Sequence, residues 1–257
     1  MKVLLIGDVV GAPGCRYLGD ILHGFRRENK IDLVIVNGEN SAVGNGMLPQ
    51  SAEALLSAGA DVITSGNHIF RRWEIYDYLE DHPYVLRPAN YPEKTIGNGY
   101  YVYDCGKYSV CVISLLGRVY MESLDCPFQT AKRIIEKEKC RFNIIDFHAE
   151  ATGEKMALAY YLDGKASCIV GTHTHVQTAD EMILPGGTGY ISDLGMTGPM
   201  NTILGVTPQN VVEKMISGMP TRFLVPQSGR CKMEGVIAEL EESSGRCTRM
   251  ERVRICE

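Results

Sequence analysis

Acidic, amide and imidazole side chains recur in this sequence just beyond short apolar runs. Those that could bind a metal ion are, in chain order, Asp8, Glu39, Asn40, Asn67, His148, His173 and His175. Carboxylates, amides and imidazoles are hard to borderline ligands that suit iron, manganese or zinc. None of the nine cysteines belongs to the set. The residue types therefore favour a catalytic metal centre over a structural zinc site built from thiolates.

The number of these ligands indicates more than one metal ion. Seven ligands are too many for one tetrahedral ion, whereas two ions that share a carboxylate would use them well. Two ions held about 3.5–4 Å apart can clamp a phosphate and lower the pKa of a bridging water, which then attacks phosphorus in line. The pattern therefore predicts hydrolysis of a phosphate ester.

Each of these residues also has a structural explanation when taken alone. Asp8 could cap a helix, Glu39 could lie in a solvated turn, and His148 could be a core histidine. The pair His173 and His175 is a stronger signal, because alternate residues of an extended segment point the same way. All the structural explanations would have to hold at once, so the set favours one shared site.

The elements that would position these residues begin as an alternation of strands and helices. Short apolar runs predict strands at 3–6, 33–36 and 61–64. Apolar residues at helical spacing predict helices between them, at 18–25 and 52–60. A βαβαβ start implies a parallel sheet. Asp8, Glu39 and Asn67 each follow one of the three strands, at the edge where ligands bind in open α/β sheets.

The remainder of the chain supplies a second sheet. Hairpins are predicted from 100–104 with 108–116 and from 231–239 with 247–255. Between them, helices are predicted at 131–139 and 156–162, and strands at 142–147, 168–170 and 181–184. His148 follows the run that ends at Phe147, and His173 follows the run that ends at Val170. With no low-complexity linker and no solenoid repeat, we expect one domain over residues 1–257, with two sheets and helices outside.

Composition excludes several classes of protein. A net charge of −5 argues against a protein that grips long nucleic acid, but leaves small anionic substrates open. No run approaches the about 18 apolar residues of a membrane span, and the start MKVLLIGD is too short for a signal-peptide core. An odd number of cysteines without a CxxC pair fits the reducing cytoplasm. The glycines at 7–14 lack GxGxxG spacing, which leaves a nicotinamide or P-loop enzyme as a weak alternative.

Several motifs resemble those of calcineurin-like metallophosphoesterases. Gly66-Asn-His68 and Gly171-Thr-His-Thr-His175 are similar to the GNH and GHTH motifs of that superfamily. Two departures are typical of its YmdB branch: Asp8-Val-Val10 lacks the histidine of the usual DxH, and Gly38-Glu-Asn40 replaces GDxxD. Further segments that resemble YmdB sequences are 7–11, 146–152 and 192–199.

The resemblance implies an α/β fold, an α/β/β/α sandwich of two mixed sheets, and two metal ions. Iron is the expected metal, with manganese or zinc as alternatives. The implied activity is hydrolysis of 2′,3′-cyclic nucleotides to 3′-nucleotides by a hydroxide that the two ions activate. The implied ligands are Asp8, Asn40 and His175 for one ion and Asn67, His148 and His173 for the other, with Glu39 shared between them. His68 would lie outside the metal shell and protonate the leaving 2′-oxygen.

Other functions use the same residues. A phosphomonoesterase or broad nuclease would need the same metals, and a regulatory protein could keep the metals but act through a partner. The expected partner is a small cyclic nucleotide, with neither a membrane nor long nucleic acid. Apolar Phe128, Ile203 and Leu204 in polar surroundings also lead us to expect self-association.

Overall fold

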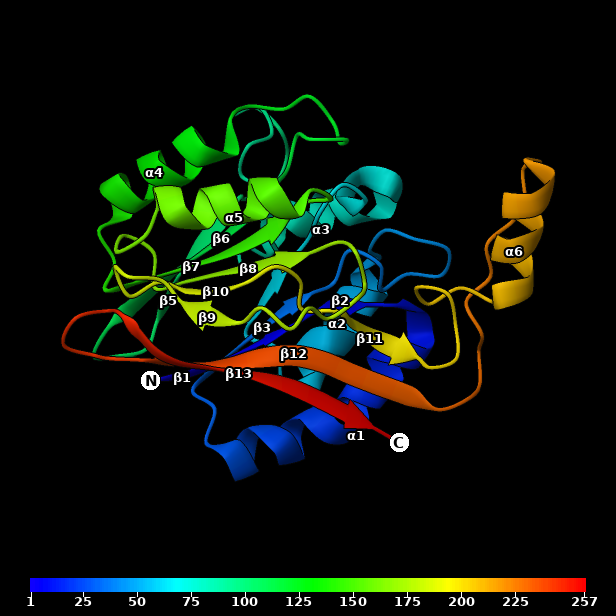
Figure 1. Ribbon diagram of the computed structural model, residues 1–257, viewed down its shortest axis with the longest axis horizontal. Coiled ribbons are helices and arrows are strands. Elements are labelled where there is room, and N and C mark those ends of the chain that lie inside the picture. Colours follow the sequence, from blue (N-terminus) through cyan, green and yellow to red (C-terminus); the bar gives the residue numbers. More distant parts are fainter.

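Two mixed β-sheets pack face to face in the computed structural model, which describes residues 1–257 (Figure 1). The first sheet has seven strands in the order β2-β11-β12-β1-β3-β4, with β13 paired to β12. Its strands are β1 (Lys2–Ile6), β2 (Asp8–Val9), β3 (Leu33–Asn37), β4 (Val62–Thr64), β11 (Met196–Pro199), β12 (Cys231–Leu240) and β13 (Cys247–Cys256).

The second sheet has six strands in the order β5-β6-β7-β8-β10-β9. Its strands are β5 (Tyr100–Asp104), β6 (Ser109–Leu116), β7 (Phe142–His148), β8 (Cys168–Thr172), β9 (Met182–Ile183) and β10 (Gly189–Ile191). Strands β6, β7, β8 and β10 run parallel, whereas β5 and β9 are antiparallel edges.

Helices cover the outer face of each sheet, and one helix stands apart (Figure 1). They are α1 (Gly11–Asn29), α2 (Pro49–Ala58), α3 (Tyr76–Asp81), α4 (Pro127–Glu138), α5 (Thr152–Tyr161) and α6 (Pro208–Ser217), with short 3-10 turns at Ile69–Arg71 and Trp73–Ile75. Helices α1 and α2 pack on the seven-stranded sheet, and α4 and α5 pack on the six-stranded sheet. None of the helices has the length and apolar character needed to cross a membrane.

Alternation along the buried strands creates the layers. In β1, Val3 and Leu5 enter the core between the two sheets, whereas Leu4 and Ile6 face the α1 and α2 layer. Residues of β6, β7 and β8 divide in the same way between the inter-sheet core and the α4 and α5 layer. Successive side chains of a strand point to opposite faces, so continuous apolar runs fill two cores at once. The result is the predicted α/β/β/α sandwich.

The predicted strand–helix order is confirmed, including both hairpins. The sequence patterns missed the strands β2, β10 and β11, which are only two to four residues long. They also missed the six-residue helix α3 and the helix α6, which lies in loop-like surroundings. Parallel pairing of β1 with β3 and of β3 with β4 brings their carboxyl ends to one edge. Parallel β6, β7 and β8 do the same in the second sheet, and both edges meet at the site described next.

Candidate metal centre

The eight residues predicted to do chemistry form one cluster at the carboxyl ends of the parallel strands. They are Asp8, Glu39, Asn40, Asn67, His68, His148, His173 and His175, and contacts of 3.6 Å or less join them into a continuous network. Asp8 begins β2 and His148 ends β7, so these two lie within strands and not just beyond them. The others lie in the connections that follow β3, β4 and β8.

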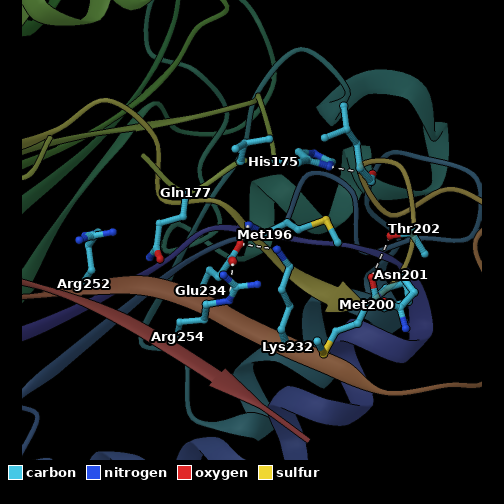
Figure 2. Close-up of a pocket in the computed structure, with 13 residues that line it drawn as sticks. His175, Gln177, Met196, Met200, Asn201, Thr202, Lys232, Glu234, Arg252 and Arg254 are labelled. Atoms are coloured by element: carbon cyan, nitrogen blue, oxygen red, sulfur yellow. Dashed lines mark hydrogen bonds and ion pairs between the residues drawn. The ribbon is translucent and has the colours of Figure 1, made fainter. Parts of the chain in front are cut away.

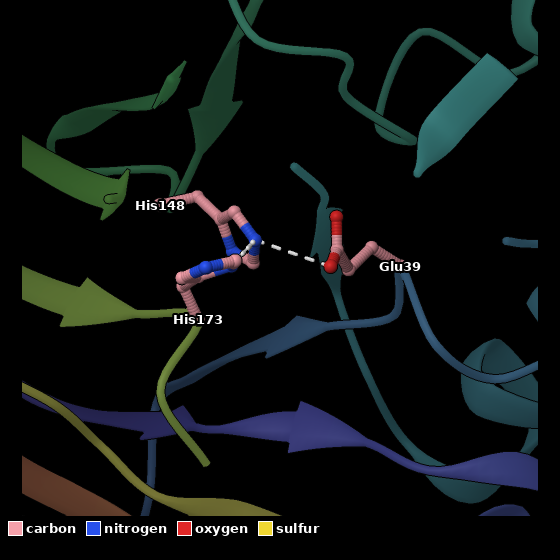
Figure 3. Close-up of side chains that lie close together, drawn as sticks. All are labelled: Glu39, His148 and His173. Carbon is pink, nitrogen blue, oxygen red and sulfur yellow. Dashed lines mark hydrogen bonds and ion pairs between the residues drawn. The ribbon is translucent and has the colours of Figure 1, made fainter. Parts of the chain in front are cut away.

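Glu39 is the most central of these side chains. Its Oε1 lies 3.1 Å from His148 Nε2, and that nitrogen lies 3.0 Å from His173 Nδ1 (Figure 3). Asn67 Oδ1 approaches the same His148 nitrogen at 3.2 Å. Donor atoms of Glu39, Asn67 and His173, delivered at the ends of β3, β4 and β8, thus surround the His148 nitrogen at the end of β7, and Glu39 is 1% exposed there.

Asp8 organises a second group beside the first. Its Oδ1 lies 3.4 Å from Asn40 Nδ2 and 3.6 Å from His175 Nε2. Asn40 Nδ2 also lies 3.1 Å from Glu39 Oε1, so Glu39 borders both groups. The donor atoms are thus divided between two neighbouring groups that have Glu39 in common.

Each of the three histidines near Glu39 and Asp8 is oriented by an oxygen on its far side. His148 Nδ1 lies 2.9 Å from the Thr172 hydroxyl, and His175 Nδ1 lies 3.0 Å from the Leu204 carbonyl. His173 Nε2 lies 3.1 Å from a carboxylate oxygen of Glu150. Such contacts fix the tautomer and leave the other ring nitrogen free as a ligand, as in most metal-binding histidines.

The donor set fits a cationic centre. Asn40 Nδ2 faces three acceptors, namely Asp8 Oδ1, Glu39 Oε1 and His175 Nε2, although an amide group has two hydrogens to donate. Ligand atoms of Glu39, His148 and His173 also lie within 4.8 Å of one another, close enough to bind one ion together. If the amide rotated by 180°, Asn40 Oδ1 would face the same three acceptors and could bind a metal ion together with them. The cluster therefore fits metal ions better than it fits a hydrogen-bonded core.

His68 differs from the other histidines in its contacts. Its Nδ1 lies 3.0 Å from Asn40 Oδ1 and 3.3 Å from Glu39 Oε1, and its backbone N–H donates to Glu39 Oε2 at 3.1 Å. The side chain is 24% exposed and lines a cavity of about 500 Å³ above the cluster. His68 is thus placed against two expected ligands while remaining open to a bound substrate.

Charges within the cluster influence one another strongly. Burial opposes the charge of Glu39, but the imidazoles of His148 and His68 hold its pKa well below the ordinary value. Burial likewise lowers the pKa of His148, yet the carboxylates of Glu39, Asp8 and Asp146 outweigh it and raise the pKa to about 9. The same carboxylates that raise this pKa would also favour a bound metal cation.

A polar network that joins the two sheets lies beneath the cluster. Asp146 of β7 accepts hydrogen bonds from Asn37 of β3 at 2.9 Å, from Thr172 of β8 at 2.7 Å, and from the Thr64 hydroxyl of β4. Burial raises the pKa of Asp146 in spite of these donors. Thr172 links this network to His148, so sheet packing and ligand orientation depend on the same residues.

The segment that carries His173 and His175 is not extended, and that sequence argument was wrong. Both residues have positive φ, 105° for His173 and 63° for His175. L-residues with side chains rarely adopt this region, and such strain persists where surrounding contacts enforce it. Here the His173 N–H donates to Asp8 Oδ2 at 3.1 Å, and the Thr174 N–H donates to Asp193 Oδ2 at 3.0 Å. Both rings nevertheless reach the cluster.

Lack of space for a side chain explains why a glycine, Gly66, precedes Asn67 and His68. A Cβ at Gly66 would lie 2.2 Å from the His148 ring and 2.4 Å from Glu39 Oε2. Any side chain at this position would displace a central carboxylate and a central imidazole. The motif therefore combines an expected ligand, a cavity-lining histidine and the space that their neighbours need.

The largest cavity lies beside the cluster and not over it. It measures about 730 Å³ and meets the cluster at His175 (Figure 2). Two of its cations are engaged by one buried acid: Lys232 pairs with Glu234 at 2.7 Å, and Arg254 pairs with the same side chain at 3.3 Å. The smaller cavity of about 500 Å³, which Glu39, Asn40, His68 and His173 line, is therefore the one that can present a substrate to the cluster.

Sequence reasoning missed several residues that support the site. They are Asp146 and Thr172 below it, Lys155 and Asp193 behind Thr174, Glu150 beside His173, Arg72, and Phe223. Arg72 donates to the carbonyls of Val43 and Asn45 and so holds the glycine-rich loop against the cavity. Asp146 and Glu150 flank His148 in a segment that resembles YmdB sequences, whereas nothing in the pattern pointed to Arg72 or Phe223.

Two facing mixed sheets deliver acids, amides and imidazoles to one edge, which is the arrangement that the resemblance to calcineurin-like metallophosphoesterases implies. The chain belongs to the YmdB-like protein family, whose model matches residues 4–253. This result confirms the family resemblance. The curated relatives described next, which are named as a phosphodiesterase and a putative phosphatase/phosphodiesterase, make the chain an enzyme of the phosphoesterase class.

Individual relatives cover almost the whole chain. It is 43% identical to a 2′,3′-cyclic-nucleotide 2′-phosphodiesterase of Bacillus subtilis (strain 168), over 99% of this chain and 97% of that protein. It is 34% identical to a putative phosphatase/phosphodiesterase of Mycoplasma pneumoniae, over 100% of this chain and 94% of that protein.

Solved structures share the fold of this chain. A hypothetical protein from Thermus thermophilus superposes with a TM-score of 0.94 at 40% identity, with 100% of both chains covered. A putative 5′-nucleotidase from Staphylococcus aureus superposes with a TM-score of 0.61 at 15% identity, over 98% of this chain and 54% of that one, and shows a shared fold.

Proposed function

We propose that this chain is a metal-dependent phosphodiesterase that hydrolyses 2′,3′-cyclic nucleotides to 3′-nucleotides at a dinuclear centre. The observation that carries the proposal is the convergence of two donor groups on Glu39, beneath a cavity of about 500 Å³. The name of the Bacillus subtilis relative supports the substrate class.

The donor groups suggest how two ions would be held. Asp8, Asn40 and His175 would hold one ion, Asn67, His148 and His173 would hold the other, and the Glu39 carboxylate would serve both. When bound, such ions supply Lewis acidity toward a phosphate and activate water for attack on phosphorus. Imidazole and carboxylate ligands without thiolates suit iron, manganese or zinc, and iron is the metal we propose because the family resemblance implies it.

His68 is the residue of this chain that we propose to act on the leaving group. The Asn40 side-chain amide lies 3.0 Å from His68 Nδ1, so the ring presents Nε2 away from the donor cluster. With Oδ1 turned toward a metal ion, the amide N–H would donate to Nδ1 and leave the ring proton on Nε2. A proton delivered from Nε2 to the departing 2′-oxygen would open the cyclic diester and leave the phosphate on the 3′-oxygen. Asn40 would then position His68 as well as a metal ion.

Phosphomonoesterase activity is the second candidate, because the name of the Mycoplasma pneumoniae relative includes phosphatase beside phosphodiesterase. The cavity lining helps to separate the two candidates, because it contains no lysine or arginine. A monoester carries up to two negative charges at the phosphate, whereas a cyclic diester carries one. We therefore expect the diester to be preferred.

The test combines metal analysis with a panel of substrates. Protein purified without chelators should contain about two equivalents of transition metal by elemental analysis. It should hydrolyse 2′,3′-cyclic AMP faster than 3′,5′-cyclic AMP, a linear dinucleotide or 3′-AMP, and chromatography should show 3′-AMP as the product. Faster turnover of the monoester would favour the second candidate, and metal-loaded protein inactive on every substrate would contradict both.

Two further expectations from the sequence stay predictions. The cytoplasm is the expected compartment, and a small nucleotide rather than long nucleic acid is the expected substrate. The nine cysteines are all free thiols in the structure, which is the state that a reducing compartment maintains.

A further inference from the structure

The cavity above the metal cluster has two chemically different sides. One side consists of carboxylate, amide and imidazole groups, including Glu39, Asn40 and His68. The other includes four apolar side chains, namely Leu204, Val206, Phe223 and Val225. The polar side provides for the phosphate, so the apolar side must provide for a part of the substrate that is neutral and poorly hydrated.

The apolar wall is formed by two segments that flank α6 and are fastened to each other. The Thr207 N–H and the Thr207 hydroxyl both donate to the Leu224 carbonyl, at 2.8 and 3.0 Å. Farther along, Arg16 of α1 donates to the Gln227 carbonyl at 2.9 Å. These bonds fix the backbone on both sides of Val225, so the wall has a defined position relative to the cluster.

Phe223 is the only phenylalanine, tyrosine or tryptophan in the cavity lining. Its side chain is 40% exposed, and the ammonium of Lys214 from α6 lies 4.7 Å from the centre of its ring. A cation over an aromatic ring is attractive and restrains the ring in one orientation. An exposed aromatic ring that is held in place at the mouth of a cavity can receive a flat partner without much loss of side-chain entropy.

We propose that the wall of Leu204, Val206, Phe223 and Val225 binds the base of the nucleotide, with Phe223 as the stacking residue. This inference rests on the proposed function. In a 2′,3′-cyclic nucleotide, one ribose joins the base to the phosphate ring, so a phosphate at the cluster must place its base within the same cavity. The volume of about 500 Å³ lies in the range of cavities that enclose small molecules.

The chemistry of the wall also determines how bases are distinguished. None of its four side chains can donate or accept a hydrogen bond, so the wall cannot read the edge of a base. Stacking tolerates every base, because each has a π face, and it favours the larger purines. We therefore expect adenine, guanine, cytosine and uracil to be accepted, with a modest preference for purines.

The experiment compares substrates with and without a base. 2′,3′-Cyclic AMP and 2′,3′-cyclic UMP would be assayed beside methyl riboside 2′,3′-cyclic phosphate, which has the same reacting group but no base. For each, kcat/KM would be measured with the wild-type protein, Phe223→Ala, Phe223→Tyr and Leu224→Ala. Leu224 is the matched control, because it is an exposed apolar neighbour (47%) outside the cavity lining.

Wild-type protein should favour cyclic AMP over the baseless substrate. In Phe223→Ala that ratio should fall by about 5- to 100-fold, as expected for the loss of a stacked base. Phe223→Tyr should restore the ratio, and Leu224→Ala should leave it unchanged. A wild-type ratio near one, or an equal loss on both substrates in Phe223→Ala, would overturn the proposal. Wild-type protein that hydrolyses none of the three substrates would instead refute the proposed function.

Discussion

The ammonium of Lys155 lies 2.9 Å from the carboxylate of Asp193, and both side chains are 1% exposed. Asp193 also accepts the N–H of Thr174, the residue between His173 and His175, at 3.0 Å. A buried ion pair that includes a residue of α5 therefore holds the backbone that presents two of the clustered imidazoles.

Asp193→Asn should lower the free energy of unfolding by about 3–5 kcal/mol, because it leaves a buried ammonium without its counter-charge. The double variant Lys155→Met with Asp193→Leu should recover part of this loss, since it removes both charges. Urea denaturation of the single and double variants measures the difference. A single variant as stable as wild type would show that the pair contributes nothing at this position.

Metal binding should depend on Glu39 more than on any other ligand, because its carboxylate borders both donor groups. Glu39→Gln keeps the shape of the side chain but removes its negative charge. We expect metal content to fall from about two equivalents to less than one, with a lower melting temperature, because bound ions stabilise the native state. Elemental analysis and calorimetry measure the two effects.

Glu53→Gln is the matched control for this experiment, since Glu53 lies on α2, pairs with His82 and has 56% of its side chain exposed. It should keep both metals and the wild-type melting temperature. Two full equivalents of metal in Glu39→Gln would refute the shared-ligand assignment.

The clustering of the expected ligands follows from a simple geometric rule. Residues that follow parallel strands gather at one edge, so the positions of Glu39, Asn67 and His173 could be inferred from apolar runs. Lys155 and Asp193 could not be inferred this way, because a buried pair between a helix and a loop leaves no periodic signal. The φ of 105° at His173 could not be predicted from the sequence either, because tertiary hydrogen bonds impose it against the local backbone preference.

Self-association should occur through α6. Four apolar residues recur at helical spacing on its outward side and the turn that follows, and they are Val212 (47% exposed), Met215 (76%), Ile216 (81%) and Met219 (64%). An amphipathic helix normally turns such a stripe toward a core, but α6 stands away from the body of the chain (Figure 1). A second copy of this chain would cover the stripe.

Light scattering should therefore give a mass above 28.4 kDa at micromolar concentration. Ile216→Glu should shift the protein toward the monomer without loss of stability, whereas Glu213→Gln on the same helix should not. A monomeric wild-type protein would refute the prediction. Phe128, one of the residues that first suggested self-association, packs instead against the core beneath α4 and α5.

The role of His68 can be tested because a proton donor and a metal ligand predict different results. His68→Ala should keep about two equivalents of metal and lose about 100- to 10,000-fold in kcat on 2′,3′-cyclic AMP, the usual cost of removing a general acid. A nitrophenyl phosphodiester has a leaving group that departs without a proton, so its rate should fall much less.

His23→Ala is the matched control, because this exposed histidine lies on α1 and contacts the Ser57 carbonyl rather than any expected ligand. Equal losses on the two substrates would exclude the acid role, and loss of metal would make His68 a ligand. Asn40→Ala should remove both a ligand and the group that holds His68 Nδ1 at 3.0 Å. Adding His68→Ala to Asn40→Ala should therefore cost less than His68→Ala alone, because side chains that act together lose their effect together.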